Sequence, residues 1–223
     1  MGGVSAVASE HPAESTEHLV RRLESFSDIV IGFSLAEVTL SLHVPASLGS
    51  LLDDPRWLIA YLWTFAVVSQ LWYMHHRLFV RAFFPTRLTV PLHFAWLASL
   101  GLIVFSLQVY VRFIDVPSSA RAVTLAYFAL YGVNLGLIAI LYALGVHRLR
   151  AIEHGTARAH AARRTAIRIG IAAAVVLVLV ALGPALHGQT FWFVVPPSIG
   201  YGFAVANSFM RFVWREPRPL SAT

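Results

Sequence analysis

The sequence predicts an all-α, polytopic membrane protein with six transmembrane helices and both termini in the cytoplasm. Three observations predict it: the composition, six long apolar runs and a one-sided distribution of arginines. Of the 223 residues, 57% are hydrophobic and only 13% are charged, whereas soluble chains carry about 25% charged residues. A chain this apolar cannot cover itself with a polar surface in water, so most of it is expected to face lipid.

Crossing the hydrocarbon takes about 20 mostly apolar helical residues, and six stretches qualify. Short linkers with turn formers such as Pro45, Gly49 and Pro117 separate them. Residues 1–20 are expected to form a cytoplasmic polar tail, residues 21–218 the transmembrane domain and residues 219–223 a C-terminal tail. The six expected spans are Phe26–Val44, Trp57–Met74, Val90–Val111, Ala122–Val146, Ile169–Leu186 and Phe191–Trp214.

All 17 basic residues are arginine, and 14 of them fall on the side of the N-terminal tail. Such a bias places that side in the cytoplasm and predicts a multi-pass protein of the cell membrane. The net charge of +6 is then expected to face anionic lipid headgroups. Nucleic acid is not an expected partner, because no folded domain outside the spans could present the charge to it. The three arginines on the opposite side are Arg56, Arg112 and Arg121.

Ionisable groups within a span are costly and mark functional sites. The first span contains two carboxylates, Asp28 and Glu37, which lie nine residues apart and so face opposite sides of a helix. Near Asp28 at the cytoplasmic boundary, a buried polar network is expected that fixes the first two helices. Its members are Arg22, Phe26, Ser27, Asp28, Trp72 and His75.

The stretch Arg22-x-x-x-Phe26-Ser27-Asp28, followed by Trp72-x-x-His75, resembles the bacterial TMEM175-like potassium channels. The resemblance covers residues 21–215. It implies a homotetramer whose first helices line a central pore closed by bulky side chains. It also implies potassium as the permeant ion, no cofactor, and no selectivity filter made of carbonyl groups. The chain departs from the family pattern at Ile29, where the family has glycine.

Carrying the family pattern over by position puts the pore layers on Phe33, Glu37 and Leu40. Their i, i+4, i+7 spacing places them on one helical stripe. Glu37 stands where the family has a bulky apolar residue, so four copies would form an acidic ring that favours cations. The alternative for Glu37 is a buried carboxylate paired through Gln70, Gln108 or Asn134.

An enzyme is not expected. The chain has no cysteine, no phosphate-binding glycine loop and none of the common hydrolase motifs. No metal site is expected either, because His75 and His76 are adjacent on a helix and point about 100° apart. Two other functions stay open: a secondary ion- or proton-coupled transporter, and a non-conducting accessory membrane protein of the same fold.

Overall fold

A computed structural model of the chain describes residues 12–41, 56–113, 117–152 and 156–183. These residues form five helices. The sixth expected span, Phe191–Trp214, lies outside the described residues, as do the ends of the first and the fifth. The helices are α1 (Pro12–Ser41), α3 (Arg56–Ala82), α4 (Thr89–Phe113), α5 (Pro117–Ile152) and α6 (Ala157–Leu182).

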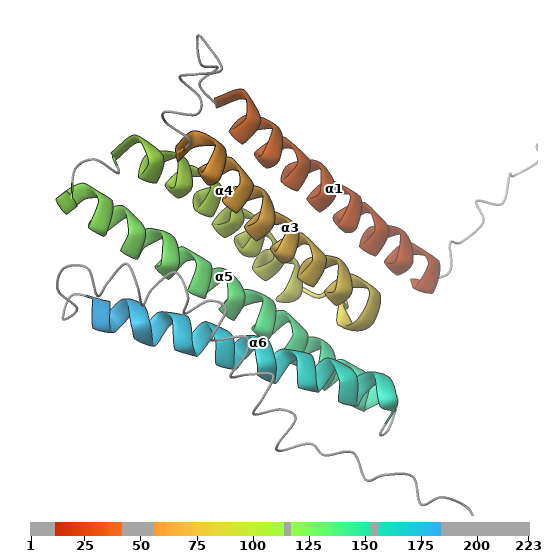
Figure 1. The fold of residues 1–223 in the computed structure, drawn as a ribbon. Coiled ribbons are helices and arrows are strands. Elements are labelled where there is room, and N and C mark those ends of the chain that lie inside the picture. Colours follow the sequence, from red (N-terminus) through yellow and green to blue (C-terminus); the bar gives the residue numbers. More distant parts are fainter. Residues whose placement is uncertain (1–11, 42–55, 114–116, 153–155, 184–223) are drawn as a thin grey trace, which may run out of the picture.

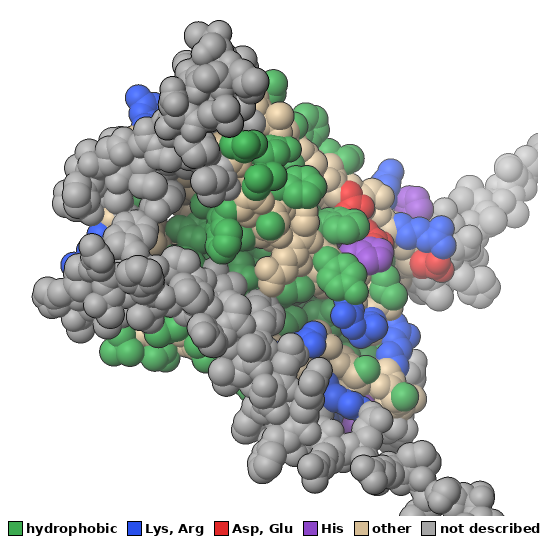
Figure 2. All heavy atoms as spheres, viewed as in Figure 1, with side chains coloured by type: hydrophobic (Ala, Val, Ile, Leu, Met, Phe, Trp, Pro, Cys, Tyr) green, Lys and Arg blue, Asp and Glu red, His purple; other side chains and the backbone are tan. Residues whose placement is uncertain are grey.

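The five helices run side by side, each antiparallel to the next along the chain (Figure 1). α1 packs against α3 and α4 at one edge, and α6 packs mainly against α5 at the other. The start of α1, the end of α3, the start of α4, the end of α5 and the start of α6 therefore share one end of the bundle. Arginines gather at that end (Figure 2), and we call it the arginine-rich end.

Three of the described helices are long and apolar enough to cross a bilayer, within Thr89–Val109, Arg121–Ile152 and Ala157–Leu182. The other two are more polar: α1 contains Asp28 and Glu37, and the second half of α3 contains His75, His76 and Arg77. The described part of the chain is thus all-helical, with apolar helices of the kind that cross a membrane.

Several helices are longer than the apolar runs that predict them. α1 begins at Pro12 and α6 at Ala157, well before the expected spans at Phe26 and Ile169. The reason is that hydropathy detects the part of a helix that lies in lipid, whereas good helix formers such as alanine, glutamate and arginine continue it into the headgroups and water. The first turn of α6 is capped by the Thr156 side chain, which accepts a hydrogen bond from the Ala159 amide.

The core lies between α3, α4 and α5. Its largest fully buried side chains are Trp96 on α4 and Tyr131 and Tyr142 on α5. α3 contributes Leu71 and Leu78. These large side chains fix the relative positions of the three central helices, because native interiors are close-packed.

Two glycines of α5 lie directly against a neighbouring helix. A Cβ on Gly145 of α5 would overlap the carbonyl oxygen of Ala82 at the end of α3. A Cβ on Gly132 would lie 2.8 Å from the Leu177 side chain of α6. Small residues let helix backbones come together in this way within membranes.

Two features hold the arginine-rich end together. Arg158 at the start of α6 donates through Nε to the Arg81 carbonyl (2.9 Å) and through a terminal nitrogen to the Val80 carbonyl (3.4 Å), at the end of α3. The turn between α3 and α4 is fixed by Thr86 and Thr89: the amide of each donates to the hydroxyl of the other, at 2.8 and 3.1 Å.

Candidate functional site: the buried histidine pair and the outer face of the first helix

Ser27, His93 and His75 join three helices at the arginine-rich side of the core. The Ser27 hydroxyl lies 2.9 Å from Nε2 of His93 on α4, and that nitrogen lies 3.0 Å from Nε2 of His75 on α3. All three side chains are completely buried. The three residues therefore form a polar contact between α1, α3 and α4, and we call them the serine–histidine cluster.

Aromatic rings enclose both imidazoles. The His75 ring stacks on Trp96, with centroids 4.6 Å apart and planes 9° from parallel, and it also lies 4.6 Å from Phe79. His93 meets the edges of Phe79 and Phe83 at 5.3 and 5.7 Å. These contacts fix the planes of the two rings, and within those planes the two Nε2 atoms face each other.

The hydrogen bonds assign the protons in this cluster. The Ser27 hydroxyl donates to the Leu23 carbonyl at 2.7 Å, so toward His93 it can only accept. Nε2 of His93 must then hold a proton, and the facing Nε2 of His75 must be the acceptor. A neutral His75 has its proton on Nδ1, which has no hydrogen-bond partner among the described residues.

Asp28 lies outside this cluster and pairs with Trp72. The Trp72 indole nitrogen donates to a carboxylate oxygen of Asp28 at 2.9 Å, and both residues are exposed in the single subunit. The indole also stacks on His76, which lies 3.0 Å from Glu24. A second set of contacts thus joins α1 to α3 on the side of α1 away from α4.

The structure divides the expected network into these two groups. Ser27 and His75 meet through His93, Asp28 and Trp72 meet directly, and Phe26 packs its ring edge against Phe94 of α4 at 5.8 Å. Arg22 is exposed, and no hydrogen bond or ion pair between described residues joins it to Asp28. Among the described residues, the carboxylate of Asp28 is therefore bonded to Trp72, and His75 is bonded to His93.

The sequence motifs do not indicate His93, because it is neither one of the carboxylates of the first span nor part of the Trp-x-x-His pattern. A signal was available. His93 is an ionisable residue in the first turns of an apolar span, and such residues are candidates by position alone.

Phe33, Glu37 and Leu40 lie together on the outer face of α1. Phe33 is 72% exposed and Leu40 is 86% exposed, and Glu37 between them is also exposed. The opposite face of α1 is buried through Leu23, Ser27, Ile31 and Val38. At 100° per residue the three outer side chains lie within about 60° of one another around the helix.

No hydrogen bond between described residues joins Glu37 to Gln70, Gln108 or Asn134. The Asn134 amide donates to the Trp96 carbonyl and to the Ser99 hydroxyl, at 3.1 and 2.7 Å. The amide nitrogen of Gln108 is buried and has no hydrogen-bond partner among the described residues. Across the described part of the chain, no hydrogen bond or ion pair involves Glu37.

Comparison with known proteins adds a family and a fold. The family model described as the endosomal/lysosomal potassium channel TMEM175 matches residues 22–103, which contain most of α1, all of α3 and over half of α4. No curated protein matches the chain by sequence.

Two solved structures resemble nearly the whole chain. One is the crystal structure of a lysosomal potassium-selective channel TMEM175 homolog from Chamaesiphon minutus, with a TM-score of 0.65, 20% identity, and coverage of 86% of this chain and 96% of that one. The other is a variant of the potassium channel MtTMEM175 in complex with a nanobody–MBP fusion, with a TM-score of 0.59, 17% identity, and coverage of 86% and 90%. The chain therefore has the fold of TMEM175 channel homologues, and its first three described helices match the TMEM175 family model.

Proposed function

We propose that this chain is the subunit of a potassium-permeable cation channel of the cell membrane, a homotetramer whose pore is lined by α1. The family match over residues 22–103 and the fold shared with two potassium channels support the class of function. The complete subunit would have six spans and two cytoplasmic termini, as the arginine distribution predicts.

The observation that carries the proposal is the exposed carboxylate of Glu37 between Phe33 and Leu40 on the outer face of α1. Phe33 and Leu40 on this face could face lipid, but a charged side chain in the middle of a span is costly there. The stripe must therefore face water or other subunits. Placing four α1 helices around a common axis satisfies both conditions, because the stripe then lines a hydrated path.

In this arrangement the three residues have different roles. Rings of Phe33 and Leu40 hold back ions by dewetting, because a cation that enters an apolar ring loses hydration and gains no ligands. The Glu37 ring between them keeps a hydrated layer that attracts cations.

Single-channel recording tests the proposal. The purified chain in planar bilayers, under opposed potassium and sodium gradients, should show unitary cation currents. Flux without unitary steps, coupled to a proton gradient, would indicate a transporter. Complete absence of flux would favour an accessory protein of the same fold.

Substitutions on the stripe test the assignment of the pore. Glu37→Gln keeps the shape and removes the charge, so cation conductance should fall by about threefold or more while assembly is unchanged. Phe33→Ser should wet a constriction and raise the current. Glu17→Gln is the matched control, since Glu17 is an exposed carboxylate on the same helix that pairs with Arg21 outside the stripe. If Glu37→Gln conducts like the parent, Glu37 does not face the pore.

A further inference from the structure

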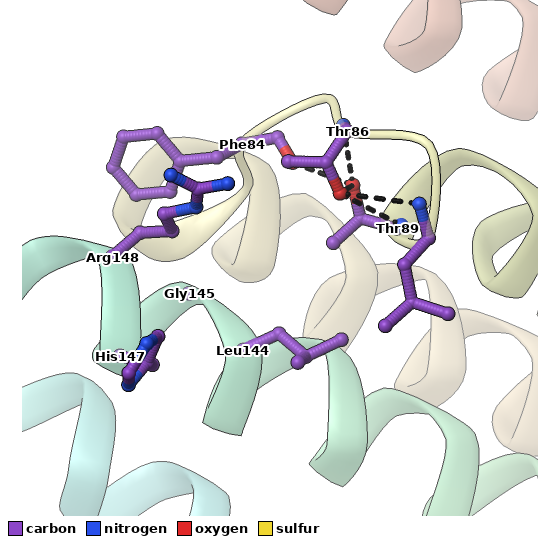
Figure 3. A pocket seen from close by; sticks show the side chains of 8 residues that line it. Phe84, Thr86, Thr89, Leu144, Gly145, His147 and Arg148 are labelled. Atoms are coloured by element: carbon purple, nitrogen blue, oxygen red, sulfur yellow. Dashed lines mark hydrogen bonds between the residues drawn. The ribbon is translucent and has the colours of Figure 1, made fainter.

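A cavity opens at the arginine-rich end between the turn that joins α3 to α4 and the last turns of α5. Its volume is about 370 Å³. Phe84, Leu88 and Leu144 form its apolar walls, and Thr86, Thr89 and Arg148 give it a polar side. His147 and Gly145 complete the lining. Figure 3 shows Arg148 extending from α5 alongside Phe84 toward the turn.

The turn between α3 and α4 forms one rigid wall of the cavity, and its threonines do not bond to Arg148. The hydroxyls of Thr86 and Thr89 bond each other at 3.0 Å, and the Thr89 hydroxyl also donates to the Phe84 carbonyl at 2.6 Å (Figure 3). Gly145 presses against Ala82 just beside it. Contacts within the protein therefore hold both walls of the cavity in place without a ligand.

Among the described residues that line the cavity, Arg148 is the one arginine. The lining includes no carboxylate, and in the described part of the chain Arg148 has no hydrogen bond or ion pair. A guanidinium presents several N–H donors in a fixed fork that matches the oxygens of a phosphate group. The chemistry that complements this cavity is thus an anionic oxygen group.

The position of the cavity distinguishes a lipid from a soluble anion. Arg148 and His147 come directly after the apolar run of α5, at the level where headgroups lie. Beside them, Leu88 is 57% exposed and offers an apolar surface at the start of α4. A soluble phosphate would use the charge only, whereas a phospholipid would use the charge for its headgroup and the apolar rim for its chains.

We propose that this cavity binds the phosphate headgroup of an anionic phospholipid, with Arg148 as its main ligand. This binding is local, unlike the diffuse attraction between the many arginines of this end and the membrane surface. It does not depend on the proposed channel activity.

Native mass spectrometry of the purified full chain, titrated with phosphatidylglycerol, tests the proposal. Loss of a charge-assisted hydrogen bond at Arg148→Gln should weaken phosphatidylglycerol binding by about tenfold or more. Arg148→Lys keeps the charge and should retain more than half of the bound lipid. Arg150→Gln is the matched control, because Arg150 is an exposed arginine two residues further along α5 that does not line the cavity. It should change binding by less than about twofold.

A second variant approaches the cavity from the opposite wall. Leu88→Glu places a carboxylate at the rim and leaves Arg148 intact, so it should also reduce phosphatidylglycerol binding by about tenfold. Equal losses in Arg148→Gln and Arg150→Gln would overturn the proposal in favour of diffuse charge. Equal affinity for phosphatidylcholine would overturn the anionic requirement. Displacement of the lipid by millimolar inorganic phosphate would overturn the lipid assignment and identify a soluble-anion site.

Discussion

His93 is bonded on two sides through one nitrogen atom, and the two bonds are not equivalent. Its Nε2 proton is directed to Ser27 and His75, at 2.9 and 3.0 Å. If His75 is removed, the proton keeps Ser27 as its acceptor. If His93 is removed, Nε2 of His75 becomes a buried acceptor without a donor, and such groups cost about 1–3 kcal/mol.

This asymmetry predicts a ranking of two variants. His93→Phe should lower the free energy of unfolding by about 1–2 kcal/mol more than His75→Phe. The apparent melting temperature of the solubilised protein should fall accordingly further for His93→Phe. A phenylalanine at position 75 keeps the stacking on Trp96 and leaves no polar group newly unpaired. Thermal unfolding followed by tryptophan fluorescence measures the ranking, with the exposed His160→Phe as control. The reverse ranking would contradict the proton assignment.

The bond between Asp28 and Trp72 predicts a modest and coupled effect. Because both side chains are exposed in the single subunit, Asp28→Ala and Trp72→Phe should each destabilise by about 1 kcal/mol, and the double variant by little more than either alone. Additive losses would show that the indole and the carboxylate act separately. A stable Asp28→Ala protein with altered ion preference would instead place Asp28 in contact with the ions.

At the level of whole helices, Gly145 controls how closely α3 and α5 approach. Gly145→Ala should force the two helices apart, because the new methyl group overlaps the Ala82 carbonyl oxygen. We expect a loss of about 2 kcal/mol or more in stability. Gly136→Ala on the same helix is the matched control, since nothing lies within 4 Å of its Cβ position; it should be neutral or slightly stabilising. Equal melting temperatures for the two variants would contradict this account of the packing.

The described helices were largely predictable from the sequence, but their ends and contacts were not. The apolar runs from Val90 and Ala122 lie within α4 and α5. Apolar runs of this length are expected to cross lipid, where a helix satisfies its own backbone hydrogen bonds. The start of α1 was missed, since polar helix outside lipid has no hydropathy signal. The pairing of His75 with His93 was missed as well: spacing along the chain shows which residues share one helix face, but not which residue of another helix meets that face.

At the level of the whole molecule, α1 lies at the edge of the bundle, and the other described helices leave its outer face uncovered. This geometry predicts self-association through α1. Native mass measurement of the purified chain should give four copies. Leu40→Asn on the outer face should leave the subunit folded, whereas Val38→Glu on the buried face should unfold it. A stable monomer or dimer of the parent chain would contradict a tetrameric pore.

The arginine distribution makes a prediction about topology that concerns the complete chain. Fourteen arginines on one side against three on the other should hold the arginine-rich end in the cytoplasm. A reporter that is active only in the cytoplasm should therefore be active when it is fused after Thr223, and a reporter that is active only outside the membrane should be inactive there. Activity of a reporter that works only outside would contradict the predicted orientation and the even number of spans.

The bonds from Arg158 to the end of α3 have a consequence for the order in which the protein is made. The last carbonyls of a helix have no partners within it, and for α3 two of them are satisfied by a residue 77 and 78 positions later in the chain. When α3 first enters the membrane, Arg158 has not yet been synthesised. The end of α3 therefore stays incomplete through the translation of α4 and α5, and the first turn of α6 closes it. The helices are thus made in order from the N-terminus, but the last carbonyl groups of α3 receive their hydrogen bonds only after the start of α6 has been made.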